Sequence, residues 1–246
     1  MSTSELVRKA VALIDAASSA GCPTRLLGGT AIAAICPSAS RPGLAREYGD
    51  IDVVTRHEHS RALGTVIESF GYTPNRRFNA LHGRARMLYY GEEGQHLDVF
   101  VDTFALCHRL ALRDRLELFP VTLAPADLLL TKLQIAELNF KDVQDLAALL
   151  VDYDVGGAPA AIDKSYICRE IVCADWGWWR TVTSNLERLA GWIGELEIAG
   201  EAKALTAHRI GQLAGAIDSH PKSVRWRIRA VIGAHMAWRE EPEEVQ

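Results

Sequence analysis

The sequence predicts an α+β protein, with strands and helices interleaved in its first part and helices alone in its second. Before Leu123, apolar positions with helical spacing alternate with short apolar runs of strand length, whereas beyond Gly157 the spacing is helical throughout. The 246-residue chain is 48% hydrophobic and 24% charged, which is the composition of a globular protein with a sizeable core. We therefore expect one domain over residues 1–122 and a helical region over 123–246. The helical region would comprise helices over 125–155 and a bundle over 158–246.

The composition of the chain limits where the protein acts and which partners it binds. No apolar run reaches the length of a membrane span, and the N-terminus lacks the charged-then-apolar order of a signal peptide, so we expect a cytoplasmic protein. The five cysteines include no C-x-x-C pair and are expected to be reduced thiols. Because the net charge is −4, any nucleic-acid contact would need a local basic patch. Two such patches exist, Arg76, Arg77, Arg84 and Arg86, and Lys222, Arg225, Arg227 and Arg229.

The elements of the first part follow from spacing and from helix-ending residues. Gly21 and Pro37 end the first two helices, and the segment 38–49, rich in Pro, Gly, Ser and Arg, is expected to be a loop. The turn Gly91-Glu92-Glu93-Gly94 joins the last two strands into a hairpin. In full, helices are expected over 4–20, 30–36 and 57–70, and strands over 24–28, 50–54, 72–78, 85–90 and 95–101.

Carboxylates stand out within the predicted strands. Asp50 and Asp52 are two residues apart, so their side chains point to the same face of a strand. Two adjacent carboxylates repel each other, and Mg²⁺ would relieve that repulsion while keeping sites for substrate phosphates. Asp98 lies in a later strand otherwise built for burial, where an acid indicates a function. Taken alone, the Asp50–Asp52 pair is equally compatible with a surface strand or turn.

A phosphate site is expected just before these acids. Gly28, Gly29 and Thr30 follow a strand and begin a helix, where small residues let backbone N–H groups approach an anion. A glycine pair after a strand is also common without function. Arg46 precedes Asp50 by four residues and would brace a carboxylate or contact a phosphate, with a solvated loop arginine as the alternative.

The predicted helices after Leu123 carry charged residues that can be either functional or structural. Lys132 is the only cation of an apolar helix that starts near Pro125, and it is either functional or a lysine extending from a half-buried face. Asp142 and Asp145 share a face of the next helix, with a surface pair between Lys141 and Asp145 as the alternative.

Beyond Gly157, helices are expected over 161–173, 176–192, 199–219 and 221–238. The aromatic cluster in the second of these is expected to pack between helices rather than to stack on bases; it comprises Trp176, Trp178, Trp179 and Trp192. In the last helix, Arg225, Trp226 and Arg229, with Lys222 before them, form a basic aromatic stripe that is the better candidate for a polynucleotide contact.

These residues resemble those of a known family. Leu27-Gly28-Gly29, Asp50-Ile51-Asp52 and Leu97-Asp98-Val99 are similar to the three-carboxylate signature of the polymerase-beta-type nucleotidyltransferase superfamily. The run Arg46 to Asp52, Lys132-Leu133 and Lys141-Asp142-x-x-Asp145-Leu146 resemble the AbiEii-like branch, whose members include toxins of toxin–antitoxin systems. The resemblance covers about residues 24–150. One departure is a longer spacing between Gly29 and Asp50, which makes the segment 38–49 an insertion.

The resemblance implies a nucleotidyltransferase fold with a small mixed sheet and flanking helices, a catalytic core over 1–122 and helices over 125–155 on its active-site side. It implies that Asp50, Asp52 and Asp98 are catalytic and hold two Mg²⁺ ions, with Mn²⁺ as an alternative metal. Gly28, Gly29, Thr30, Arg46 and Lys132 would bind the nucleotide. The reaction would move a nucleoside monophosphate from a nucleoside triphosphate (NTP) to an acceptor hydroxyl, releasing pyrophosphate.

The acceptor is left open by the sequence. It would be RNA or tRNA, bound through Lys222, Arg225 and Arg229, or a protein, as in toxin-like members, and an antitoxin would then be a partner. The alternatives are a small-molecule, antibiotic-type nucleotidyltransferase and a non-catalytic nucleotide-binding module.

Overall fold

A computed structural model describes residues 2–240, apart from the side chain of Glu93. The chain divides into two compact units. The first comprises Met1–Ile35, Glu47–Phe104 and Leu110–Leu123, and the second comprises Cys36–Arg46, Ala105–Arg109 and Ala124–Gln246. The predicted loop over 38–49 therefore belongs mostly with the helical unit, although it lies between two strands of the first unit in the sequence.

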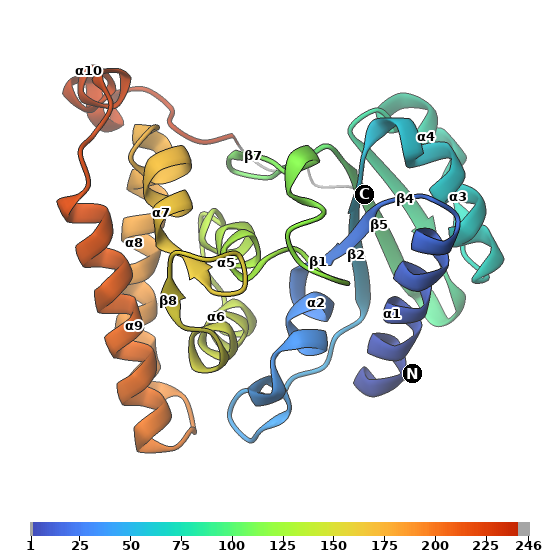
Figure 1. Ribbon diagram of the computed structural model, residues 1–246, viewed down its shortest axis with the longest axis horizontal. Helices are drawn as coiled ribbons and strands as arrows, with labels where there is room; N and C mark the ends of the chain where they lie inside the picture. The colour runs from blue at the N-terminus through green and yellow to red at the C-terminus, as the bar shows by residue number, and fades with distance from the viewer. Residues whose placement is uncertain (1, 241–246) are drawn as a thin grey trace. The chain divides into compact units, whose positions relative to one another are not determined.

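The first unit is built on a five-stranded mixed sheet of order β1-β2-β5-β4-β3. The parallel pair β2 and β5 lies at its centre, and the other neighbouring strands are antiparallel (Figure 1). This sheet, together with the helices of both units, confirms the predicted α+β class. The strands are β1 (Thr24–Leu27), β2 (Asp50–Thr55), β3 (Thr73–Pro74), β4 (Arg86–Tyr90) and β5 (His96–Val101).

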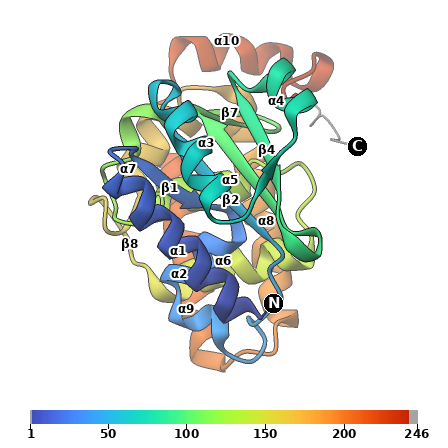
Figure 2. The same cartoon turned by 90° about the vertical axis from the view of Figure 1, so that its right-hand side faces the viewer.

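Helices α1 (Thr3–Ser19) and α3 (Ser60–Ser69) lie side by side against this sheet (Figures 1 and 2). Helix α1 starts with a capping box, in which Ser2 accepts from the Glu5 N–H and Glu5 accepts from the Ser2 N–H. Its apolar face is fully covered and comprises Leu6, Ala10, Leu13, Ile14 and Ala17. Helix α2 (Gly28–Ile35) follows β1 directly, and Pro37 follows its end as expected.

The strand predicted over 72–78 is wrong beyond its first residues. Pairing with β4 covers only Thr73 and Pro74, after which the chain forms helix α4 (Arg76–His82). Asn75 caps this helix by accepting a hydrogen bond of 3.0 Å from the N–H of Phe78. Local capping therefore outweighs the strand propensity of the flanking aromatic residues.

The second unit is mainly helical, as predicted. Its longer helices are α5 (Pro125–Leu133), α6 (Phe140–Asp152), α8 (Trp176–Trp192), α9 (Gly200–Ser219) and α10 (Val224–Ile232). The segment predicted as a helix over 161–173 is more varied: a short parallel pair, β8 (Val155–Gly156) and β9 (Ile162–Asp163), precedes α7 (Lys164–Tyr166) and a π-helical turn over Ile167–Val172. A two-stranded ribbon, β6 (Thr103–Ala105) and β7 (Arg109–Ala111), completes the list of strands.

Three tryptophans of α8, Trp176, Trp178 and Trp179, pack against other rings as expected, whereas Trp192 is 36% exposed and the prediction is wrong for it. The rings of Trp179 and Trp226 meet edge to face with centroids 5.2 Å apart, and Trp178 stacks on His108 at 4.8 Å. All five cysteines are unpaired and buried. Among the residues that the structure describes, no helix combines the length and apolarity needed to span a bilayer.

His108 is a buried polar group of the second unit and is 6% exposed. Its Nε2 lies 2.8 Å from Thr181 Oγ1, and its N–H donates to Gln134 Oε1 at 3.1 Å. Burial, with a smaller contribution from Arg239, lowers the pKa of His108 from 6.5 to about 4, against the opposing charge of Asp175. The folded chain therefore holds this imidazole neutral over a pH range in which the unfolded chain protonates it.

We predict that lowering the pH from 6.5 to about 4 removes up to about 3 kcal/mol of unfolding free energy through His108. Between these values the unfolded state binds a proton that the folded state does not, so stability falls as the pH falls. Urea unfolding across this range should show a shallower pH dependence for His108→Gln than for the unchanged protein. The same substitution at the exposed His208 should leave the pH dependence unchanged; equal slopes in all three proteins would contradict this assignment.

Candidate active site

The start of α2 lies against the carboxylate of Asp52. Gly28 connects β1 to α2 with φ of +70°, and a Cβ atom at this position would overlap Asp52 Oδ2. Only glycine satisfies both the backbone angle and the space. The N–H groups in the first turn of a helix have no partners within that helix, so this end of α2 is suited to bind an anion.

Three carboxylates share one face of the sheet next to this helix start. Asp50 and Asp52 alternate along β2, and Asp52 is the register partner of Asp98 on the parallel strand β5. Register partners point to the same side, so the structure brings the three predicted acids together on β2 and β5. Asp50 is exposed, Asp52 is partly exposed and Asp98 is 8% exposed. The acids therefore run from solvent into the protein.

Asp98 is paired with a cation that the sequence argument did not assign to it. Arg86 Nε donates to Asp98 Oδ1 at 2.7 Å, and the Arg86 guanidinium lies over the Phe100 ring at 5.4 Å. Arg86 stands two residues from Leu88, the register partner of Asp98, and so shares its face of the sheet. The predicted hairpin does not reveal this pair, because counting back from a four-residue turn pairs Arg86 with Val99. The observed register is shifted by one residue and pairs Tyr90 with His96.

The donor set fits a hard divalent cation in its chemistry, since carboxylate oxygens are the ligands that Mg²⁺ prefers. Gly28 leaves Asp52 room that a Cβ would fill. Within residues 2–240, however, no three His, Cys, Asp or Glu side chains are arranged as a group that could hold a metal ion. Asp50 and Asp52 thus fit the predicted metal, whereas Asp98 would have to share its carboxylate with Arg86.

Thr30 uses its hydroxyl within the fold. Its Oγ1 donates to the Asp50 carbonyl oxygen at 2.6 Å, and the residue is 2% exposed. This bond fixes the first residue of β2 against α2. A phosphate would therefore meet Thr30 through its backbone N–H rather than through its hydroxyl.

Arg46 and Lys132 lie in the second unit, in a buried ion cluster with two acids of α6. Arg46 binds Asp145 with both Nε and an NH2 group, at 2.9 and 2.7 Å, and Lys132 Nζ lies 2.8 Å from Asp145 and 2.9 Å from Asp142. The side chains are 13%, 12%, 0% and 6% exposed for Arg46, Lys132, Asp145 and Asp142. Neither a solvated Arg46, nor an extended Lys132, nor a surface pair of Lys141 with Asp145 is observed.

Opposite charges in this cluster hold each other ionised. Burial alone would raise the pKa of Asp145, but the hydrogen bond from Arg46 and the charge of Lys132 outweigh it and lower that pKa. Burial likewise disfavours the charged Lys132, yet Asp145 and Asp142 raise its pKa. The stability that these pairs contribute is present at neutral pH. It is lost as the pH falls below the ordinary value of 3.8 for Asp145 or rises above the ordinary value of 10.5 for Lys132.

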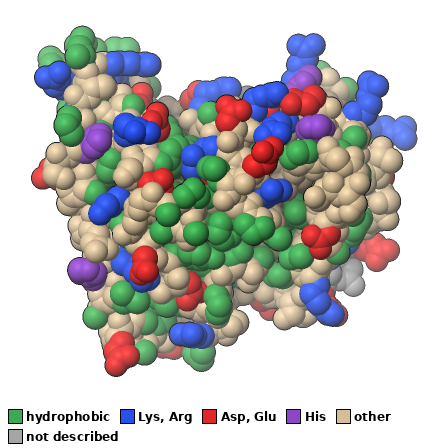
Figure 3. Space-filling model, in the orientation of Figure 1, with side chains coloured by type: hydrophobic (Ala, Val, Ile, Leu, Met, Phe, Trp, Pro, Cys, Tyr) green, Lys and Arg blue, Asp and Glu red, His purple; other side chains and the backbone are tan. Residues whose placement is uncertain are grey.

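The basic stripe near the C-terminus is partly used inside the fold. Lys222 donates to the carbonyl oxygens of Ile217, Asp218 and His220, and Arg229 donates to that of Met236 and lies 4.8 Å from the Trp176 ring. Arg225 is exposed. The exposed side of α10, at the upper left of Figure 3, is apolar along its centre, formed by Val224, Ile228 and Val231. This arrangement does not favour a polynucleotide contact through the three predicted residues.

Comparison with known proteins identifies no family for this chain. No protein-family model matches the sequence. No curated protein matches it either. Among solved structures, the lincosamide antibiotic adenylyltransferase LnuA, bound to lincomycin, is similar to this chain with a TM-score of 0.41 and 16% sequence identity, over 58% of this chain and 94% of that one. A likeness this weak establishes neither a common fold nor a common activity.

We predict that Gly28→Ala destabilises the protein by about 1 kcal/mol or more beyond Gly21→Ala, which is the usual cost of forcing an added group into a filled space. Both glycines have φ of +70°, but a Cβ at Gly21 meets nothing within 4 Å, whereas one at Gly28 meets Asp52. The shared backbone strain cancels, and the difference reports the packing of Asp52 against α2. Urea unfolding of the two variants measures it. Equal costs would show that Asp52 moves away freely.

Asp145→Ala should lower the unfolding free energy by about 3–5 kcal/mol, because it removes the buried carboxylate that both Arg46 and Lys132 bind. Glu187→Ala, which removes an exposed acid in the middle of α8, should change it by less than about 0.5 kcal/mol. Chemical unfolding monitored by circular dichroism compares the two. A similar small effect for both variants would mean that the cluster does not stabilise the second unit.

Proposed function

We propose that this protein is a polymerase-beta-type nucleotidyltransferase, which moves a nucleoside monophosphate from an NTP to an acceptor hydroxyl and releases pyrophosphate. The proposal rests chiefly on one observation: Asp50, Asp52 and Asp98 share a sheet face beside a helix start where a glycine is required. The resemblance of Leu27-Gly28-Gly29, Asp50-Ile51-Asp52 and Leu97-Asp98-Val99 to the superfamily signature supports it. The reaction itself is what that resemblance implies, and three acids beside a helix start suited to an anion are compatible with it.

Each residue has a role in this proposal. The N–H groups at the start of α2, from Gly29 and Thr30, bind the triphosphate, and Gly28 leaves the adjacent space to the Asp52 carboxylate. Asp50 and Asp52 would hold Mg²⁺ or Mn²⁺, with Asp98 as a further ligand, and the metal would neutralise phosphate charge and activate the acceptor hydroxyl. Arg86 holds Asp98 Oδ1 in place. Asp98 Oδ2 would then be the oxygen offered to the metal.

Arg46 and Lys132 remain predicted nucleotide contacts, but only if a phosphate can displace the carboxylates that they already bind. Each is neutralised by Asp145 or Asp142, so a phosphate would have to compete with these carboxylates. Their established contacts stabilise the second unit. Their part in nucleotide binding is therefore secondary to that of the α2 helix start.

The ion pair between Arg86 and Asp98 favours a second candidate function. A cation already occupies one oxygen of the third carboxylate, as in a module that binds nucleotides without turning them over. Such a protein would bind an NTP through α2 yet transfer nothing. Turnover therefore separates the two functions, while nucleotide binding does not.

The test is label transfer from each α-labelled NTP with Mg²⁺, offered total RNA, a cell extract as a protein source, or a lincosamide antibiotic as a small acceptor. We expect transfer to one acceptor class, reduced at least about 1,000-fold in Asp50→Asn and in Asp52→Asn because the metal ligands are lost. Asp114→Asn, at an exposed acid, serves as the matched control. For Asp98→Asn we expect lost turnover with NTP binding largely kept.

Two outcomes would contradict the enzyme proposal. NTP binding that depends on Asp50 and Asp52 without transfer to any acceptor would support the non-catalytic module. Transfer that survives in Asp50→Asn and Asp52→Asn would place the chemistry elsewhere. Transfer to RNA or protein would bring the toxin-like branch and an antitoxin partner forward, whereas transfer to the antibiotic would favour a small-molecule enzyme.

A further inference from the structure

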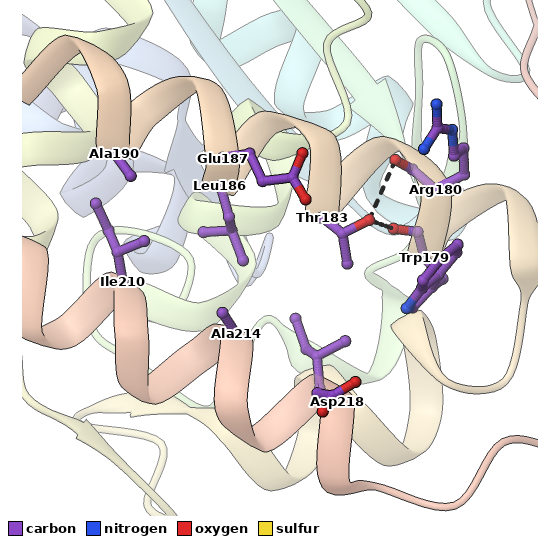
Figure 4. Close-up of a pocket in the computed structure, with 10 residues that line it drawn as sticks. Trp179, Arg180, Thr183, Leu186, Glu187, Ala190, Ile210, Ala214 and Asp218 are labelled. Carbon is purple, nitrogen blue, oxygen red and sulfur yellow. Dashed lines mark hydrogen bonds between the residues drawn. The ribbon is translucent and has the colours of Figure 1, made fainter.

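A cavity of about 360 Å³ opens between α8 and α9 in the second unit (Figure 4). Its size is that of pockets that hold small organic molecules. It exists because the facing positions of the two helices carry small residues, Thr183 and Ala190 on α8 and Ala214 on α9. The Thr183 hydroxyl donates to the Trp179 carbonyl oxygen at 2.7 Å, so it is satisfied within its own helix.

The floor of this cavity is apolar. Leu186, Ile210 and Ile217 line it and are 2%, 5% and 1% exposed, so they belong to the hydrophobic contact between the helices. A hydrocarbon group placed over these side chains would extend the apolar contact, and its transfer out of water would favour binding. The cavity therefore suits the apolar body of a ligand.

The rim is acidic and aromatic. Glu187 comes from α8 and Asp218 from α9; both are exposed, and neither side chain forms an ion pair with any residue in the described part of the chain. Arg180 also lines the cavity, but Figure 4 shows its side chain directed away from α9, and among the described residues it forms no ion pair with either acid. Trp179 closes one end, supported edge to face by Trp226. A cation is attracted both to the two carboxylates and to an indole face.

We propose that the cavity between α8 and α9 binds a small organic cation, a protonated amine carried on an apolar body. The amine would lie between Glu187, Asp218 and Trp179, and the body would cover Leu186, Ile210 and Ile217. An anionic ligand such as a nucleotide is disfavoured, because two carboxylates would face it. This inference uses only residues of the second unit and does not depend on the proposed reaction.

The test is calorimetric titration of the full chain with 4-phenylbutylamine and with its uncharged counterpart, 4-phenylbutanol. We expect the amine to bind at least about 5-fold more tightly than the alcohol, with Glu187→Gln and Asp218→Asn each weakening the amine about 2- to 5-fold and leaving the alcohol unchanged. Glu201→Gln, at an exposed acid of α9 outside the cavity, should leave both unchanged. Trp179→Leu should selectively weaken the amine.

A filling substitution locates the site. Ala214→Leu should abolish amine binding by occupying the cavity, while Ala204→Leu, at an exposed alanine elsewhere on α9, should not. Circular dichroism verifies that both variants are folded. The proposal is overturned if the amine does not bind at millimolar concentration, if the alcohol binds equally well, or if Ala214→Leu binds as the unchanged protein does.

Discussion

The position of Asp52 against the start of α2 is the constraint on which the first unit depends. Gly28 must adopt a positive φ to turn from β1 into α2 at once, and it must lack a side chain because Asp52 occupies the adjacent space. The Thr30 hydroxyl then ties the same helix to the first residue of β2. The helix start and the acid-bearing strand are thus fixed to each other by two contacts within three residues, which holds the first turn of α2 beside a pair of carboxylates.

The predicted site residues fall into two groups that differ in how far their charges are neutralised by neighbouring side chains. In the first unit, Asp50 is exposed at the start of β2, and Arg86 holds only one oxygen of Asp98. In the second unit, Arg46 and Lys132 are balanced by Asp145 and Asp142 and are almost fully buried. Breaking the second group costs a buried charge, whereas Asp50 and Asp98 retain carboxylate oxygens that can take a new partner. The first group is therefore where the structure supports chemistry, and the second is where it supports stability.

Much of the fold could be predicted because its signals are local. Capping residues, Pro37 and the apolar spacing of α1 each act within a few positions of the chain. That Asp50 and Asp52 point to the same face follows from the alternation of side chains along a strand. The helix at Arg76–His82 was missed because a single cap at Asn75 reversed an aromatic strand pattern. The pairing of Arg46 with Asp145 spans 99 residues, so no local pattern reveals it. The pairing of Arg86 with Asp98 was missed as well, because the predicted four-residue turn gives a hairpin register one residue away from the observed one.

The account's central claim is that Asp50, Asp52 and Asp98 form a metal and nucleotide site beside Gly28. The most direct measurement is a crystal structure with Mn²⁺ and a non-hydrolysable NTP analogue, in which anomalous scattering locates the metal. The account predicts Mn²⁺ bound by carboxylate oxygens of Asp50 and Asp52, with the triphosphate at the start of α2 and Asp98 turned to the metal on its Oδ2 side. Manganese and analogue bound elsewhere, with Asp50 and Asp52 left without metal, would contradict it.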